Sequence, residues 1–223
     1  MKRLSKNELQ RFVQENQLLL GTLARPGLML TSNQQVVKFF YPRKFISTSL
    51  FIPQAKRFRS NSMKLKQLGI TAPDVSELIF CPDVPVHMAV YPYLKGDDFR
   101  ILCSKNDYLC IDRLPAYIAL LHAKGVYFRA IHLGNILQLD ENELALVDIT
   151  DLTVRSDRLT IFQRARNIAH LFDSTEDKQL LVEYGLRRFL NSYYLSANLS
   201  DGNIKWLEWR LKMGLSGDLK SYS

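Results

Sequence analysis

Residues 125–151 read GVYFRAIHLGNILQLDENELALVDITD, and this stretch carries the clearest structural pattern in the chain. Two short apolar runs, at 136–139 and 144–147, are separated by the polar turn DEN, which is typical of a β-hairpin. A hairpin holds the residues at its two outer ends side by side. We therefore expect Asn135, which precedes the first strand, and Asp148, which follows the second, to converge on one point.

An amide oxygen and a carboxylate at one point suit a hard cation such as Mg²⁺, which takes oxygen ligands and accompanies phosphates. In the kinase pattern H-R-D-x-x-x-x-N followed by D-F-G, the Asn and the second Asp are these ligands. The corresponding segments here are FRAIHLGN, which ends at Asn135, and DIT, which begins at Asp148.

On these residues the chain resembles the protein-kinase-like superfamily. Within it, YFRxxHLGN followed by VDI-x-D is most similar to the small bacterial lipopolysaccharide core kinases and the related toluene-tolerance family. The resemblance implies an α+β, two-lobed protein-kinase-like fold. A small β-rich N-lobe is expected over residues 1–94 and a mainly helical C-lobe over residues 95–223, together forming one domain.

Two departures from the kinase pattern concern the catalytic loop. Ala130 stands where a kinase has the Asp that accepts the proton of the substrate hydroxyl, so the usual general base is absent. Phe128 replaces a His, which is a milder change because both are flat rings. Asp151 is the nearest carboxylate that could replace the base or approach the ion bound at Asp148, and the alternative is that Asp151 is the N-cap of the segment that follows.

The N-terminal third is expected to contact the nucleotide. The run QQVVKFFY at 34–41 reads as a strand with Lys38 at its centre, and the resemblance implies that Lys38 holds the α and β phosphates. The segment YPYLKG resembles the hinge of the superfamily, where Tyr91 and Tyr93 would lie beside the adenine. A lone Lys in a strand can also be a solvated charge, and YPYLKG can also be a plain strand-to-loop transition.

The net charge of +8 is concentrated in this same third of the chain. No Asp or Glu occurs from Asn16 to Pro73, and the helix predicted over 53–68 therefore lacks the Glu that fixes the Lys of a kinase. A positive field attracts anionic lipid surfaces, phosphorylated saccharides or nucleic acid, whereas a solvated basic face needs no partner. The nine basic residues are Arg25, Lys38, Arg43 and Lys44, and, as an anionic-ligand surface on the predicted helix, Lys56, Arg57, Arg59, Lys64 and Lys66.

The composition, with 47% hydrophobic and 23% charged residues, is that of a soluble globular protein. Three cysteines without metal-ligand spacing predict buried free thiols in a reducing compartment. Since no signal segment and no membrane-length apolar run occurs, we expect a cytoplasmic protein, either free or peripheral on the inner face of the inner membrane. No nucleic-acid motif occurs, and the oligomeric state is not indicated.

Helices account for most of the remaining sequence. Ser5 followed by Glu8 predicts a capping box at the start of a helix. Apolar stripes predict the others, and the predicted helices are Ser5–Gln17, Asp107–Lys124, Asp157–Phe172, Thr175–Leu195 and Asn203–Lys212.

The resemblance implies an ATP- and Mg²⁺-dependent phosphotransferase acting on a lipopolysaccharide or related envelope saccharide. Asn135 and Asp148 would bind Mg²⁺, Asp148 and Asp151 would be the catalytic carboxylates, and Arg129 would brace the loop. The expected partners are a nucleotide and a lipid-linked saccharide or an anionic membrane surface. Because the base and the helix Glu are missing, the alternative is a catalytically impaired pseudokinase that binds nucleotide or acts as a scaffold in envelope biogenesis.

Overall fold

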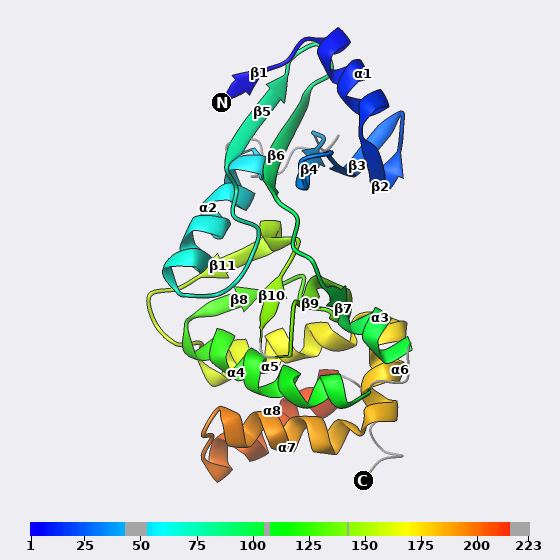
Figure 1. Cartoon of the computed structure of the whole chain (residues 1–223). Helices are drawn as coiled ribbons and strands as arrows, with labels where there is room; N and C mark the ends of the chain where they lie inside the picture. Colours follow the sequence, from blue (N-terminus) through cyan, green and yellow to red (C-terminus); the bar gives the residue numbers. More distant parts are fainter. Residues whose placement is uncertain (43–52, 105–107, 142, 215–223) are drawn as a thin grey trace. The chain divides into compact units, whose positions relative to one another are not determined.

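The computed structural model describes residues 1–42, 53–104, 108–141 and 143–214. The chain divides into two compact units, Met1–Lys95 and Gly96–Ser223 (Figure 1). The first unit is built around one six-stranded sheet, while the second is mainly helical and contains two small sheets. The predicted α+β class, with a β-rich N-terminal part and a helical C-terminal part, is confirmed.

The sheet of the N-terminal unit has the strand order β1-β5-β6-β4-β3-β2. Neighbouring strands in this sheet pair antiparallel, except that β1 and β5 are parallel. Strands β2 and β3 form a hairpin whose turn lies at residues 23–24. The strands are β1 (Lys2–Arg3), β2 (Gln17–Thr22), β3 (Arg25–Leu30), β4 (Gln35–Phe40), β5 (Glu77–Cys81) and β6 (Val86–Pro92).

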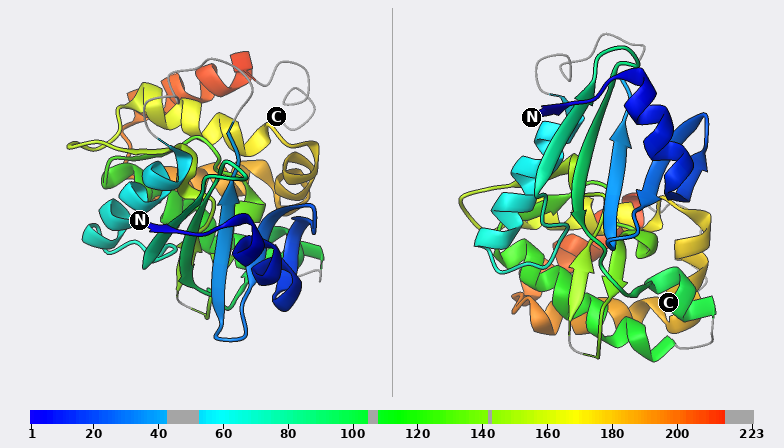
Figure 2. Two further views of the ribbon diagram at one scale, coloured as in Figure 1. Left: turned by 90° about the horizontal axis from the view of Figure 1, so that it is seen from above. Right: turned by 45° about the horizontal axis from the view of Figure 1, so that its top comes forward.

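Alternation along β4 decides which helix covers which face of this sheet. Leu9 packs in a buried cluster with Phe39, whereas the ring of Phe58 lies 5.6 Å from that of Phe40. Because successive side chains of a strand point to opposite faces, the helices that carry Leu9 and Phe58 cover opposite faces. Figure 2 shows both helices along the sheet. They are α1 (Lys6–Glu15) and α2 (Gln54–Gln67).

The ends of these helices follow from the sequence. The Ser5 hydroxyl accepts the N–H of Glu8 at 3.3 Å, and the Glu8 carboxylate accepts the N–H of Ser5 at 2.7 Å, so the predicted capping box is confirmed. After α2, Gly69 adopts a φ of +64°, and the N–H of Ile70 donates to the carbonyl of Leu65 at 2.9 Å. Glycine takes this left-handed conformation without steric cost.

The C-terminal unit packs its helices around two small sheets, of order β10-β9-β7 and β11-β8. Its strands are β7 (Asp97–Asp98), β8 (Val126–Phe128), β9 (Ile136–Gln138), β10 (Leu144–Leu146) and β11 (Leu152–Val154). Its α-helices are α3 (Phe99–Ser104), α4 (Leu114–Ala123), α5 (Ile161–Ala169), α6 (Thr175–Tyr184), α7 (Leu186–Ser196) and α8 (Asp201–Gly214).

Two predicted helices are interrupted. The helix predicted from Asp107, which itself lies outside the described residues, is a 3₁₀ turn over Tyr108–Arg113 followed by α4. Pro115 explains the break, because proline fits only the first turn of an α-helix. The helix predicted over 175–195 is split into α6 and α7 at Gly185, whose φ of +107° ends α6.

The predicted state of the cysteines is confirmed, since Cys81, Cys103 and Cys110 are all free and buried. The thiols of Cys103 and Cys110 lie 4.0 Å apart. No helix among the described residues combines the length and the apolar character needed to cross a bilayer.

Candidate functional site

The hairpin predicted from residues 136–147 is confirmed. Strands β9 and β10 are antiparallel, with Ile136 opposite Leu146, and the N–H of Val147 donates to the carbonyl of Asn135 at 2.9 Å. Asn135 and Asp148 therefore flank the same end of the hairpin, as the sequence pattern requires.

Asn135 presents its amide oxygen as the available ligand atom. Asn135 is buried, and its Nδ2 donates to the carbonyl of Ala130 at 2.9 Å. Since this bond fixes the amide nitrogen on the loop backbone, Oδ1 is the atom that points elsewhere and can accept a hydrogen bond or bind a cation.

Asp148 holds an unusual backbone conformation, with φ +51° and ψ +44°. The left-handed region costs a residue with a Cβ about 1 kcal/mol, and such conformations gather at functional sites. Its carboxylate is exposed, and the Thr150 hydroxyl donates to Oδ1 at 3.4 Å. The chain therefore keeps an accessible carboxylate beside Asn135 at a conformational cost.

Arg129 and Asp151 are brought together by their backbones. Strands β8 and β11 pair antiparallel, and at the edge of this ladder the N–H of Arg129 donates to the carbonyl of Asp151 at 3.2 Å. Asp151 ends a 3₁₀ turn and leads directly into β11. The alternative in which Asp151 caps a following helix is therefore wrong, because a strand follows it.

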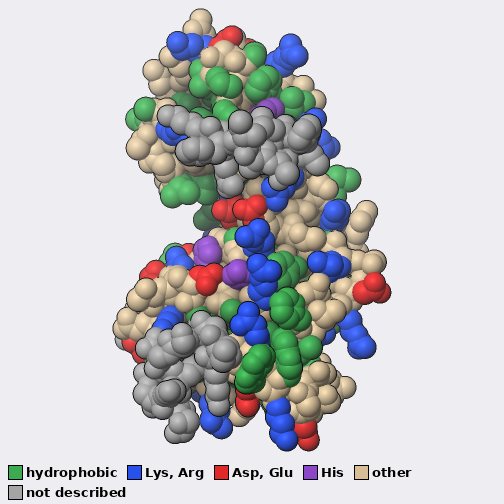
Figure 3. Space-filling view, turned by 180° about the vertical axis from the view of Figure 1, so that it is seen from behind, with side chains coloured by type: hydrophobic (Ala, Val, Ile, Leu, Met, Phe, Trp, Pro, Cys, Tyr) green, Lys and Arg blue, Asp and Glu red, His purple; other side chains and the backbone are tan. Residues whose placement is uncertain are grey.

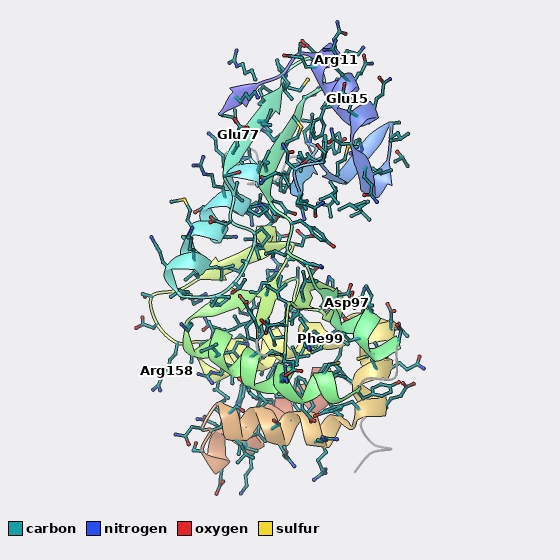
Figure 4. All side chains as sticks on the ribbon, viewed as in Figure 1. Arg11, Glu15, Glu77, Asp97, Phe99 and Arg158 are labelled. Atoms are coloured by element: carbon teal, nitrogen blue, oxygen red, sulfur yellow. The ribbon has the colours of Figure 1, made fainter. Side chains whose placement is uncertain are left out.

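The short strand β7 brings a third element to the hairpin. Asp98 pairs with Leu137 of β9, and α3 begins directly afterwards at the buried Phe99, which Figure 4 labels together with Asp97. Arg100, the next residue of α3, is thereby placed close to the loop that ends at Asn135.

A partly buried ion pair, which the sequence does not indicate, holds this loop. Asp177 of α6 is fully buried, and its Oδ2 accepts the N–H of Leu133 at 2.9 Å. Its Oδ1 accepts from Nε of Arg100 at 2.5 Å, and this hydrogen bond raises the pKa of Arg100. A Cβ added to Gly134 would lie 3.2 Å from the Arg100 guanidinium, so the loop and the ion pair are closely packed.

The sequence offered no direct signal for this pair. Ser174 and Asp177 form an S-x-x-D pattern, which indicates a helix N-terminus, and Ser174 does cap α6. Nothing in that pattern shows that the Asp177 carboxylate turns inward to a loop 44 residues earlier.

His132 lies within the braced loop as a half-buried imidazole. Burial lowers the pKa of His132, and the positive charge of Arg100 lowers it further. The nearby carboxylates raise this pKa by less, so that the net shift is downward; they belong to Asp177, Asp148 and Asp98. Neutral imidazole is therefore favoured beside Asn135.

Lys38 lies on β4 of the N-terminal unit in an aromatic environment. Its Nζ is 5.4 Å from the ring centroid of Phe58 and 5.8 Å from that of Phe40. These distances are within the range of cation–π attraction. Lys38 therefore extends over the sheet face that α2 covers.

The two tyrosines of the predicted hinge have different surroundings in the N-terminal unit. Tyr91 is buried, with its ring 5.6 Å from that of Phe58, and so belongs to the core. The N–H of Tyr93 donates to the carbonyl of Gln34 at 2.9 Å, and the Tyr93 side chain is 42% exposed. Of the two tyrosines, Tyr93 is therefore the one whose side chain is accessible to solvent.

The basic residues of α2 occupy its outward faces. The helix buries apolar residues such as Ala55 and Leu65, and Lys66 pairs with Asp74 at 2.6 Å. Arg43 and Lys44 lie outside the described residues. Those of α2 are Lys56, Arg59, Lys64 and Lys66, which are exposed, and Arg57, which is partly exposed.

The oxygen atoms at the hairpin end are of the type that Mg²⁺ takes as ligands. Among the described residues no group of three or more His, Cys, Asp or Glu side chains is arranged to hold a metal. Mg²⁺ usually takes one or two protein oxygens and fills its other positions with water and phosphate oxygens. Oδ1 of Asn135 and the exposed carboxylate of Asp148 are a donor set of this kind.

Comparisons with known proteins give little further information. No model of a known protein family matches the sequence, and no curated protein matches it. Among solved structures, the chain is similar to the crystal structure of WbdD, with a TM-score of 0.44 and 13% sequence identity. The match covers 83% of this chain and 47% of WbdD, so the chain spans about half the length of that protein.

Proposed function

We propose that the chain is an ATP- and Mg²⁺-dependent phosphotransferase of the protein-kinase-like type. The main support is the end of the β9–β10 hairpin. There the amide oxygen of Asn135 and the exposed carboxylate of Asp148, whose backbone is in the left-handed region, flank the hydrogen bond between Val147 and Asn135. Asn135 and Asp148 would hold the metal there, and the metal would neutralise charge on the transferred phosphoryl group.

The proposed acceptor is a hydroxyl of a lipopolysaccharide or related envelope saccharide. This part rests on the sequence resemblance to lipopolysaccharide core kinases. Lys38 would contact the nucleotide phosphates, and Tyr91 and Tyr93 would lie near the base. The basic side chains of α2 would favour an acceptor or a membrane surface with negative charge.

The chemistry must proceed without the usual catalytic-loop Asp. Phosphoryl transfer passes through a loose transition state and depends mostly on positioning and charge neutralisation, so a missing base slows it without excluding it. Asp151 is joined to the loop through Arg129 and is our candidate for accepting the hydroxyl proton. The ion pair of Arg100 and Asp177 would keep the loop in place.

The metal site can be tested by measuring ATP binding with and without Mg²⁺. We expect binding that Mg²⁺ strengthens, and we expect Asp148→Asn to remove most of that strengthening, because the neutral amide is a weaker ligand for a hard cation. Glu141→Gln is the matched control, since it removes one negative charge at the turn end of the same hairpin. Equal behaviour of Asp148→Asn and the wild type would rule out the assigned site.

Catalysis needs a separate measurement of phosphate transfer from labelled ATP to extracted core saccharide. Asp151→Asn should lower the transfer rate by about 10²- to 10⁴-fold if Asp151 is the base, with the affinity for Mg²⁺ and ATP unchanged. A transfer rate that stays the same in this variant would remove Asp151 from the mechanism.

The second candidate function is a pseudokinase that binds nucleotide without turnover. Ala130 favours it, because alanine cannot accept a proton. The two functions separate in the same experiments: Mg²⁺-dependent ATP binding that needs Asp148, combined with no transfer to any saccharide tested, would support the pseudokinase.

A further inference from the structure

A cavity in the C-terminal unit is lined by arginines. It has a volume of about 290 Å³, and none of its lining residues is acidic. The lining residues are Tyr127, Arg129, Arg155, Phe162, Gln163 and Arg166.

The fold itself gathers these side chains. Tyr127 lies on β8 opposite Thr153 of β11, and Arg155 directly follows β11, where its N–H donates to the carbonyl of Gly125 at 2.9 Å. The third side of the cavity is α5, which is fixed to β8 because Asn167 donates to the carbonyl of Phe128 at 2.7 Å. The arginines therefore come from the loop after β8, the end of β11, and a helix.

The three arginines of the cavity have no acidic partner among the residues that the structure describes. In the described residues, no ion pair or side-chain hydrogen bond involves Arg129, Arg155 or Arg166. Other arginines of this unit do find carboxylates: Arg100 pairs with Asp177, and Arg188 with Asp112 at 2.7 Å. Because three positive side chains line one cavity and no carboxylate of the described residues is paired with them, the cavity would attract an anion.

An aromatic row continues from the cavity across the surface. Phe162 lines the cavity and is 51% exposed, and its ring lies 6.2 Å from that of Trp206, which in turn lies 6.4 Å from Trp209. Trp209 is also more than half exposed. In the lower part of Figure 3, Lys and Arg side chains gather beside a strip of hydrophobic ones. A ligand whose anionic group fills the cavity could therefore lay an apolar or sugar portion on the rings.

We infer that this cavity binds a phosphate group carried by a larger molecule. Arginine suits this ligand, since its planar fork donates two parallel hydrogen bonds to phosphate oxygens. Gln163 and Tyr127 line the same cavity. Oε1 of Gln163 accepts the N–H of Thr160, so its NH₂ group is the neutral donor that a ligand could use, whereas the Tyr127 hydroxyl lies 3.4 Å from Nε2 of His170. The phosphate could belong to a free phosphorylated compound or to a lipid headgroup, which share this chemistry. The site does not depend on phosphoryl transfer, because it needs neither nucleotide nor metal.

Calorimetric titration with glycerol 3-phosphate and with pyrophosphate, without nucleotide or Mg²⁺ and at constant ionic strength, tests the site. We expect saturable binding, and we expect Arg155→Gln and Arg166→Gln each to raise the dissociation constant about 10-fold, as for loss of one charge-assisted hydrogen bond. Arg158→Gln is the matched control. Arg158 is exposed on the loop between β11 and α5 (Figure 4) and does not line the cavity, so its removal should leave the constant unchanged.

A second arm distinguishes the source of the phosphate. Vesicles containing phosphatidylglycerol are compared with vesicles of phosphatidylcholine alone, and binding is followed through tryptophan fluorescence, since both tryptophans of the chain belong to the aromatic row. Binding to phosphatidylglycerol vesicles that Arg155→Gln and Arg166→Gln weaken assigns the cavity to a headgroup, and binding of the soluble phosphates alone assigns it to a free compound. No saturable binding in either arm, or an equal loss in all three variants, would overturn the inference.

Discussion

At the scale of single residues, the loop before β9 depends on one buried carboxylate. Asp177 uses one oxygen for the N–H of Leu133 and the other for Arg100, so both acceptors are occupied. Glu176 also lies near Arg100, at 3.4 Å, but its side chain is 63% exposed. Two neighbouring acids thus contact the same guanidinium in very different surroundings.

Replacing these acids in turn should separate burial from charge. We expect Asp177→Asn to lower the free energy of unfolding by about 3 kcal/mol, because the new NH₂ group would face a donor and would leave Arg100 without its charge partner. Glu176→Gln removes the same charge in solvent and should change the free energy by less than about 1 kcal/mol. The free energy of unfolding of both variants is measured by urea unfolding. Similar losses in the two variants would mean that Asp177 does not stabilise the loop.

At the scale of secondary-structure elements, the hairpin could be predicted because its information is local. Two apolar runs and a polar turn define β9 and β10, and the residues at their outer ends, Asn135 and Asp148, follow from the pairing. The capping box at Ser5 was equally readable. In each case the signal lies within a few residues of the structure that it specifies.

Other features could not be predicted because their causes lie far apart in the chain. Arg100 and Asp177 are 77 residues apart, and only the packing of α3 and α6 brings them together. The arginines around the cavity of the C-terminal unit come from three elements, and no spacing within one element indicates them. Pro115 and Gly185 are both residues that often end helices. The apolar stripes that run through both positions nevertheless favoured continuous helices.

The end of α2 allows a test at this scale that involves backbone conformation alone. A Cβ at Gly69 would meet no atom within 4 Å, so Gly69→Ala should act only through its φ of +64° and should lower the free energy of unfolding by about 1 kcal/mol. Gly202 in α8 also has open space around it and lacks a positive φ. Gly202→Ala should therefore leave stability unchanged or raise it by up to about 1 kcal/mol. The measurement is denaturant unfolding of both variants. A loss of unfolding free energy in both Gly69→Ala and Gly202→Ala would contradict this argument.

At the scale of the whole molecule, a polar network joins the elements of the C-terminal unit through their core. His122 of α4 is fully buried, with Nδ1 2.8 Å from the Tyr193 hydroxyl of α7 and Nε2 3.1 Å from Oδ1 of Asn167 on α5. The NH₂ group of Asn167 donates to the carbonyl of Phe128 on β8, so the amide oxygen of Asn167 faces His122. Since that oxygen can only accept, Nε2 of His122 must carry the ring proton. The native state therefore holds a neutral imidazole, and burial lowers the pKa of His122 to about 3, assisted by the charge of Arg164.

This neutral histidine should make the C-terminal unit sensitive to acid. In the unfolded chain His122 takes up a proton below about pH 6.5, whereas in the native state it resists protonation down to about pH 3. The stabilisation is therefore complete above about pH 6.5 and declines by about 1.4 kcal/mol per pH unit as the pH falls towards 3. Urea unfolding at several pH values should show a steeper loss in the wild type than in His122→Gln, in which the other titrating groups are unchanged. The wild-type NMR signal of the His122 ring gives an independent measurement, and a titration of that signal near pH 6.5 in the folded protein would contradict the buried neutral state.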